Sequence, residues 1–193
     1  METNQQFSRI LLATAMASIR IGLLFAGNEQ LGSVKPATQR VVNVYLENIP
    51  EMHWAVEKAK AITTHIFSPI GVKLIWVDLH HERTASQDDT IIVKFSMATP
   101  IDFRPRALAQ SFPYEGIRIQ VFYDRVRQMV IPSLVPALLG HVLAHEIAHL
   151  LEGTDLHSDS GIMKARWDAS DYDEMARELL TFTDLDICVV VRT

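Results

Sequence analysis

The stretch HVLAHEIAHLLEGTDLHSDSGIM, residues 141–163, decides how the rest of the chain is interpreted. It contains HEIAH at 145–149, which matches the pattern H-E-x-x-H. Residues four apart on an α-helix lie on one face, so the imidazoles of His145 and His149 can point at one metal ion. Zinc lowers the pKa of a coordinated water to about 7, and a neighbouring carboxylate can accept a proton from that water. The stretch therefore predicts a Zn²⁺ site with these two histidines as ligands and Glu146 as general base.

The motif lies in a segment with the features of a buried helix. Pro132 and Pro136 bracket the start of an apolar helix that runs to about Leu151, because proline is tolerated in the first helical turn. Gly153 ends the helix, since glycine readily adopts the left-handed conformation of a helix C-cap. Apolar residues around the motif make the buried face: Leu143, Ala144, Ile147, Leu150 and Leu151.

A catalytic zinc site needs a third protein ligand and one open position. Two candidates follow the helix: Asp155 lies six residues after His149, and His157 lies eight residues after it. We expect His157 to be the ligand because histidine is the commoner zinc ligand, and Asp155 is the alternative. His141, four residues before His145, is interpreted as a helix-surface residue or a hydrogen-bond donor to a ligand, since a fourth protein ligand would close the catalytic position.

This stretch resembles the metzincin superfamily of zinc peptidases, whose pattern is H-E-x-x-H-x-x-G-x-x-H followed by a methionine turn. The pair His157-Ser158 and the sequence GIM at 161–163 are similar to the end of the matrixin motif. The resemblance implies that His157 is the third zinc ligand and that Met163 forms a Met turn beneath the metal. It also keeps Asp155 as an alternative, because small bacterial members of the superfamily have an aspartate ligand at that place.

The chain departs from the metzincin pattern in its spacing. Glu152 occupies the usual glycine place, and Gly153 comes one position later. His157 lies two residues beyond the usual third histidine, and Met163 follows it by six residues, which is early. The specific part of the resemblance spans 141–167, so the chain looks like a bacterial offshoot of the metzincins.

Apolar and β-branched runs, separated by proline, glycine and charged residues, predict four strands and three helices. The strands are expected at 40–47, 72–77, 90–95 and 117–123, and the helices at 51–67, from Pro132–Pro136 to about Leu151, and at 170–182. An apolar tail at 187–191 is expected to pack or pair. A helix between the first two strands indicates a right-handed crossover. The predicted fold class is α+β: a metzincin-like mixed, twisted sheet with two long helices, one carrying the H-E-x-x-H motif, and a C-terminal helix.

Two further segments have alternative interpretations. Segment 108–116 lies where metzincins carry an edge strand that holds extended substrate, and such an edge offers unpaired backbone groups to a peptide; an irregular connection is the alternative. Glu174 and Glu178, four apart on the last expected helix, are interpreted as a solvated face. One of them would be the third ligand if the chain resembled the gluzincins, in which a later helix supplies a glutamate. Gly153 and His157 make this the second choice.

Composition limits the class of protein. Of the 193 residues, 48% are hydrophobic and 21% charged, as in one globular domain with a substantial core. The formal net charge is −5 and there is no basic run, which argues against a nucleic-acid partner. The single cysteine, Cys188, excludes a disulfide framework, a Cys-rich zinc module and a cysteine-switch latch of the N-terminal kind.

Residues 1–36 are expected to be an export signal and linker, followed by a zinc metallopeptidase domain at 37–193. Arg9 precedes the apolar stretch 10–18, in which alanines have the A-x-A spacing of a signal peptide. Arg20 interrupts the apolar run, so no stable membrane span is predicted. The chain is therefore expected to be exported, either periplasmic or secreted. A loosely attached amphipathic helix on a cytoplasmic protein is the alternative.

Three functions remain open on these observations. The favoured one is a zinc-dependent endopeptidase that hydrolyses a peptide or protein substrate with a metal-activated water and with Glu146 as general base. The second is a catalytically inactive zinc-binding module of protease-like fold that binds a peptide or a partner. The intact Glu146 argues against it, since an inactive site need not keep its base. The third is a structural domain without a metal.

Overall fold

The computed structural model describes residues 39–77, 90–114 and 117–192. Within them, one sheet contains the strands β1 (Arg40–Glu47), β2 (Val72–Val77), β3 (Thr90–Ser96), β4 (Ala109–Ser111) and β5 (Arg118–Phe122). The α-helices are α1 (His53–Phe67), α2 (Tyr123–Met129), α3 (Val135–Glu152), α4 (Ala169–Met175) and α5 (Asp184–Arg192). Two 3-10 helices, η1 (Ser68–Ile70) and η3 (Pro132–Leu134), precede β2 and α3. The α+β class predicted from the sequence is confirmed.

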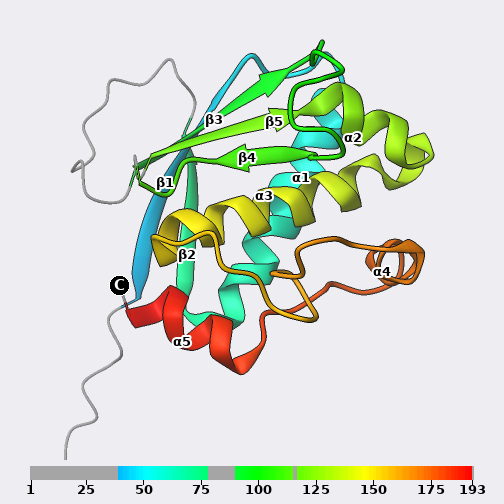
Figure 1. Cartoon of the computed structure of the whole chain (residues 1–193). Coiled ribbons are helices and arrows are strands. Elements are labelled where there is room, and N and C mark those ends of the chain that lie inside the picture. The colour runs from blue at the N-terminus through cyan, green and yellow to red at the C-terminus, as the bar shows by residue number, and fades with distance from the viewer. Residues whose placement is uncertain (1–38, 78–89, 115–116, 193) are drawn as a thin grey trace, which may run out of the picture. The chain divides into compact units, whose positions relative to one another are not determined.

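The sheet is mixed, with the strand order β2-β1-β3-β5-β4. β1 pairs in parallel with β2 and β3, β3 pairs in parallel with β5, and β4 pairs with β5 in the antiparallel direction. Helix α1 connects the parallel neighbours β1 and β2, as a βαβ unit requires. β4 lies at the edge of the sheet, on the side of α3 (Figure 1). The segment 108–116 therefore contains an edge strand rather than only an irregular connection.

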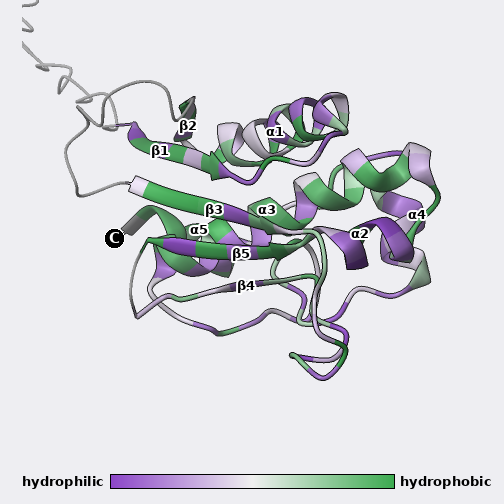
Figure 2. Ribbon diagram, turned by 90° about the horizontal axis from the view of Figure 1, so that it is seen from above, coloured by the Kyte–Doolittle hydropathy of each residue, from purple (hydrophilic) through white to green (hydrophobic). Residues whose placement is uncertain are grey.

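The long helices α1 and α3 bury one face of this sheet. Successive strand residues point to opposite faces, and in β3 the side chains of Ile91, Val93 and Phe95 are buried whereas Lys94 is exposed. Strands β1, β3 and β5 each carry hydrophobic residues, drawn green in Figure 2, and their buried residues join those of α1 and α3 in one core cluster. This cluster holds α3, which carries the H-E-x-x-H motif, close to the sheet edge.

A close crossing of α1 and α3 fixes the position of the motif further. A Cβ atom on Gly140 would lie 2.6 Å from Ile62 Cγ2 and 3.1 Å from Ala59 O, so this contact requires a glycine. The hydroxyl of the buried Thr63 lies 2.8 Å from Ala59 O and 3.0 Å from Gly140 O, which joins the two helices by a hydrogen bond. The two helices thus approach so closely that α3 has little freedom to shift along α1.

The helix that carries the motif is the central helix of the fold. Within the described part of the chain, Pro132–Glu152 is the one helix long and apolar enough to cross a membrane, but 89% of its apolar window is buried inside the protein. A core helix passes the same length and composition test. The helix ends where the sequence predicted, because Gly153 adopts the left-handed C-cap conformation with φ 65°.

The C-terminal part differs from the prediction. The expected helix at 170–182 is wrong in length: α4 ends at Met175, and the chain then runs without a regular element to α5. The physical reason is tertiary contact, because Leu180 N donates to the side chain of His141 on α3 and Thr181 O accepts from Ile162 N, instead of extending the backbone hydrogen bonds of α4. The apolar tail at 187–191 forms part of a helix, α5.

Two of the predicted element boundaries differ by a few residues from those in the structure. The last expected strand, 117–123, is shorter, because Tyr123 begins the short helix α2, which the sequence did not reveal. The first helix begins at His53 rather than at residue 51. The expected export signal and linker at 1–36, and the boundary at residue 37, lie outside the described residues.

Candidate metal centre

Three imidazoles converge beside α3. His145 and His149 lie one turn apart on this helix, and His157 reaches them from the chain that follows. One ring nitrogen of each residue lies within 4.8 Å of the corresponding nitrogens of the other two. His145 Nε2 and His149 Nε2 are 3.0 Å apart. The structure thus brings together the three histidines that the sequence singled out as zinc ligands.

Backbone carbonyls orient the two helical imidazoles. His145 Nδ1–H donates to Ile162 O at 2.7 Å, and His149 Nδ1–H donates to Thr154 O at 3.0 Å. A carbonyl oxygen only accepts, so the proton of each neutral ring is on Nδ1. The Nε2 atom of each ring therefore carries a free lone pair, which is the form in which histidine binds a metal.

The donor set fits a zinc ion. Two Nε2 lone pairs that face each other at 3.0 Å repel unless a cation lies between them. Two nitrogens bound at about 2.0–2.1 Å to a tetrahedral zinc are about 3.3 Å apart, close to the separation observed. Three imidazole ligands also leave the fourth position of a tetrahedral site for water or substrate, as in catalytic zinc sites.

The environment of the cluster favours neutral imidazoles. Burial, together with the charges of His145 and His157, lowers the pKa of His149 to about 3. Burial also lowers the pKa of His145, although its hydrogen bond to Ile162 O and the charge of Asp186 act in the opposite direction. For His157, burial and then the charge of His145 lower the pKa. Protons therefore compete weakly with a metal for these nitrogens near neutral pH.

Glu146 faces the edge strand and the cluster. Its side chain is only 9% exposed, and burial raises the pKa of its carboxyl. Hydrogen bonds from the side chain and backbone of Ser111, at the end of β4, act against this shift, as do the charges of His157 and Arg104. A carboxylate with a raised pKa is a better proton acceptor than an ordinary glutamate, so the position suits a general base.

The other candidates do not belong to the cluster. Asp155 is exposed, and the group of possible metal ligands found in the described residues does not include it. Glu174 and Glu178 are exposed, in line with a solvated face, and they are also outside this group. The interpretation of His141 as a surface residue is wrong. It is fully buried, donates from Nδ1 to a carbonyl one turn earlier, and accepts from Leu180 N at 3.1 Å, which ties α3 to the chain before α5.

Met163 lies in a tight turn that supports His145. Its side chain is 1% exposed, and its carbonyl accepts a hydrogen bond from Ser158 N at 2.8 Å. The preceding residue, Ile162, provides the carbonyl to which His145 donates. The indole of Trp167 packs edge-on to His145 with ring centroids 5.5 Å apart, and its Nε1–H donates to Gly161 O at 3.3 Å. The turn therefore fixes the ring orientation of one imidazole.

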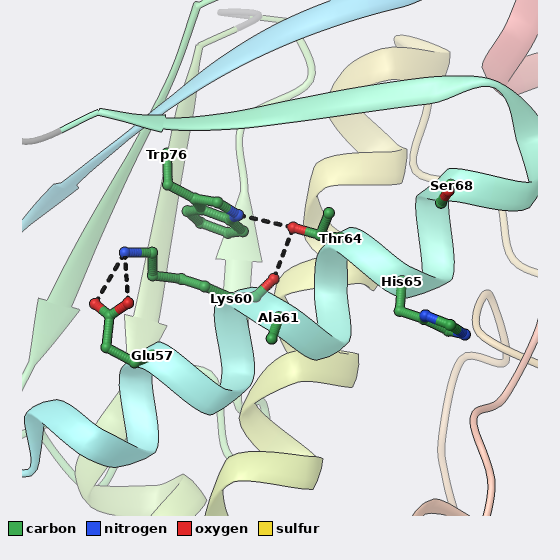
Figure 3. Close-up of a pocket in the computed structure, with 7 residues that line it drawn as sticks. All are labelled: Glu57, Lys60, Ala61, Thr64, His65, Ser68 and Trp76. Atoms are coloured by element: carbon green, nitrogen blue, oxygen red, sulfur yellow. Dashed lines mark hydrogen bonds and ion pairs between the residues drawn. The ribbon is translucent and has the colours of Figure 1, made fainter.

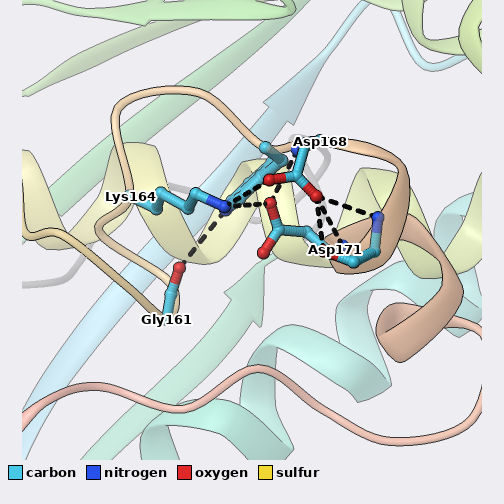
Figure 4. A network of polar contacts seen from close by, with 6 residues as sticks. Gly161, Lys164, Asp168 and Asp171 are labelled. Atoms are coloured by element: carbon cyan, nitrogen blue, oxygen red, sulfur yellow. Dashed lines mark hydrogen bonds and ion pairs between the residues drawn. The ribbon is translucent and has the colours of Figure 1, made fainter.

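A polar network holds the far end of this turn (Figure 4). Lys164 Nζ contacts Asp168 Oδ2 at 2.8 Å and Asp171 Oδ2 at 2.6 Å. The two aspartates form a capping box at the start of α4. The Asp168 side chain accepts from Ser170 N and Asp171 N, and the Asp171 side chain accepts from Asp168 N. None of the predictions from the sequence includes this network, although Asp168 and Asp171 have the three-residue spacing of a capping box.

Surface hollows lie elsewhere on the described part of the chain. One of about 450 Å³ lies between α1 and β2 (Figure 3). Four of its polar side chains pair with one another, since Lys60 pairs with Glu57 at 2.9 Å and Trp76 Nε1–H donates to Thr64 Oγ1 at 2.9 Å. A second, of about 610 Å³, lies beside the ends of β3 and β5. Neither is lined by a histidine of the cluster or by Glu146, so neither competes with the cluster as the reactive site.

The sheet, the two long helices and the cluster define a metzincin-like fold whose three histidines fit a zinc site. Among solved structures, the chain is similar to archaemetzincin from Methanopyrus kandleri, with a TM-score of 0.51 and 14% sequence identity. The likeness covers 82% of this chain and 97% of that one. No protein-family model matches the chain, and no curated protein matches it in sequence. At this identity the likeness establishes the fold, and it agrees with the resemblance seen in the motif.

The third ligand can be tested directly. His157→Ala removes one of the three donor nitrogens. It is therefore expected to weaken zinc binding by more than about 10–100-fold, which is the usual effect of losing only a residue that hydrogen-bonds to a metal ligand. Asp155→Asn is expected to leave zinc affinity near that of the wild type, because Asp155 is exposed and outside the cluster. The measurement is competition with a chromophoric chelator. The opposite order of the two variants would transfer the ligand role to Asp155.

Proposed function

We propose that this protein is a zinc-dependent endopeptidase, with His145, His149 and His157 as metal ligands and Glu146 as general base. The observation that carries the proposal is the convergence of three imidazoles, with nitrogens within 4.8 Å of one another, beside a buried glutamate. The metzincin-like fold supports it, because this arrangement of sheet and helices is shared with the solved archaemetzincin.

Each residue has a defined part in the proposed reaction. The three histidines hold the metal, and zinc supplies a Lewis acid that lowers the pKa of water to about 7 and polarises the substrate carbonyl. Glu146 accepts a proton from the water that attacks the carbonyl carbon. The same carboxyl then passes this proton to the amine nitrogen as the C–N bond breaks, so that it returns to its initial state.

The substrate is proposed to be an extended peptide. β4 is the last strand of the sheet, so one side of Ala109–Ser111 has no neighbouring strand within the described residues. An exposed strand edge can pair with an extended peptide through backbone hydrogen bonds. Because Ser111 also hydrogen-bonds to Glu146, a peptide aligned along β4 would pass close to the proposed base.

The proposal is tested by a peptidase assay on a broad peptide library with the purified chain before and after chelation. We expect cleavage by the zinc-loaded protein, loss of at least about 100-fold of the rate when the metal is removed, and recovery when zinc is returned. Equal cleavage by the metal-free protein would contradict the proposal. A zinc-loaded protein that cleaves no peptide would instead favour an inactive module that binds peptides.

A further inference from the structure

Asp186 in the first turn of α5 is a buried carboxylate with two hydrogen-bonded oxygens. Its side chain is 6% exposed. Oδ2 accepts a hydrogen bond from Thr183 N at 2.8 Å, and Asp186 N donates to Thr183 Oγ1 at 3.3 Å, which together form a capping box at the start of α5. Oδ1 accepts a hydrogen bond from Ser158 Oγ, far away in sequence. Capping explains one oxygen only.

The second oxygen connects α5 to the metal centre. Ser158 directly follows His157, the ligand supplied by the loop. In contrast to His145 and His149, His157 has no hydrogen bond from its ring to another described residue. Apart from ring contacts with His145 and His149, its position depends on the backbone beside it. Ser158 anchors that backbone twice, through its N–H to Met163 O at 2.8 Å and through its hydroxyl to Asp186.

Asp186 is also unusual because it is a buried carboxylate without a paired cation among the described residues. Buried carboxylates are normally paired with a cation, yet among the described residues no Lys or Arg forms an ion pair with Asp186. A carboxylate neighbour lies close instead: burial, and then the charge of Asp186, raise the pKa of Glu152 to about 7. A divalent cation held by His145 and its partners would supply the missing positive charge nearby.

The chain before α5 supports the same loop at a second point. Ile162 N donates to Thr181 O at 3.0 Å, and Ile162 O in turn accepts from His145. A Cβ atom on Gly161, whose φ is 72°, would lie 2.4 Å from Thr181 O, so the two backbones touch. Residues 181–186 thus brace the loop both at the carbonyl that orients His145 and at the residue next to His157.

We propose that Asp186 is a positioning residue of the zinc centre, which acts through Ser158 to hold His157 in place and which makes α5 part of the metal site. This inference rests on the proposed zinc site. It predicts that a change on the last helix weakens metal binding, although no residue of that helix belongs to the ligand cluster.

The test measures the zinc dissociation constant by chelator competition in four proteins. Asp186→Asn and Ser158→Ala are expected to weaken zinc binding about 10–100-fold, the usual effect of losing a residue that positions a metal ligand. Ser158→Ala leaves the α5 capping box intact, so it decides the question if the Asp186 variant folds poorly. Asp184→Asn is the matched control, because it is an exposed aspartate in the same helical turn, and its affinity is expected to equal that of the wild type.

A double-mutant comparison separates positioning from a general loss of stability. If Asp186 acts through His157, the effect of Asp186→Asn should largely vanish when His157 is already alanine. An equal loss of zinc affinity in both backgrounds would overturn the inference, and so would wild-type affinity in both Asp186→Asn and Ser158→Ala. A wild-type protein that binds no zinc would overturn the zinc site and this inference together, whereas unchanged affinity in the variants alone would overturn only the role of Asp186.

Discussion

Glu146→Gln is expected to retain zinc and to lose at least about 100-fold of peptidase turnover, the usual effect of removing a general base. Glutamine has the shape of glutamate and can still hydrogen-bond to Ser111, but it cannot accept the proton of the attacking water. Because Glu146 lies outside the group of possible metal ligands, the metal site should remain intact. Steady-state kinetics and zinc content are measured on the same preparation.

Glu174→Gln provides the matched control for this experiment. Glu174 is an exposed glutamate on α4, and its replacement is expected to leave both turnover and zinc content unchanged. Turnover of the Glu146 variant equal to that of the wild type, with zinc present in both, would rule out Glu146 as the base.

Replacing His145 and His149 together with alanine is expected to abolish stoichiometric zinc binding. Each change removes one of the two Nε2 atoms that face each other at 3.0 Å, and a single remaining imidazole, His157, cannot form a tetrahedral site. Zinc content is measured by elemental analysis after dialysis. His65→Ala, an exposed histidine on α1, should keep about one zinc per chain. Full zinc content in the double variant would mean that the metal binds elsewhere.

The helix and the first two ligands could be predicted from local rules. The spacing of His145 and His149 places both on one helical face whatever surrounds them. Gly153 was predicted to end α3, and it does so with the left-handed conformation that this residue permits. The strands β1, β2 and β3 also lie where β-branched runs indicated, because their side chains fill one buried face.

Features that depend on distant contacts could not be predicted in the same way. The early end of α4 and the irregular chain after it follow from hydrogen bonds made by Leu180 and Thr181 to α3 and the Met163 turn. The burial of His141 has the same origin, since its Nε2 is the acceptor for Leu180 N. Sequence spacing carries no information on which carbonyl, here Ile162 O, will orient His145.

The unusual spacing after the motif has a structural explanation. The glycine comes one residue later than in the metzincin pattern, so α3 extends through Glu152 before Gly153 ends it. Thr154 then supplies the carbonyl that accepts from His149 Nδ1–H at 3.0 Å. The loop after α3 is therefore longer than in the metzincin pattern, and His157 still lies beside the other two imidazoles.

X-ray absorption spectroscopy at the zinc edge, on the purified wild-type protein, tests the central claim most directly. The account predicts about one zinc per chain with three imidazole nitrogens at about 2.0–2.1 Å and one oxygen ligand in the open position. In the His157→Ala protein the number of imidazole ligands should fall to two. A wild-type spectrum with two imidazoles and an added carboxylate, or a protein without zinc, would contradict the three-histidine centre.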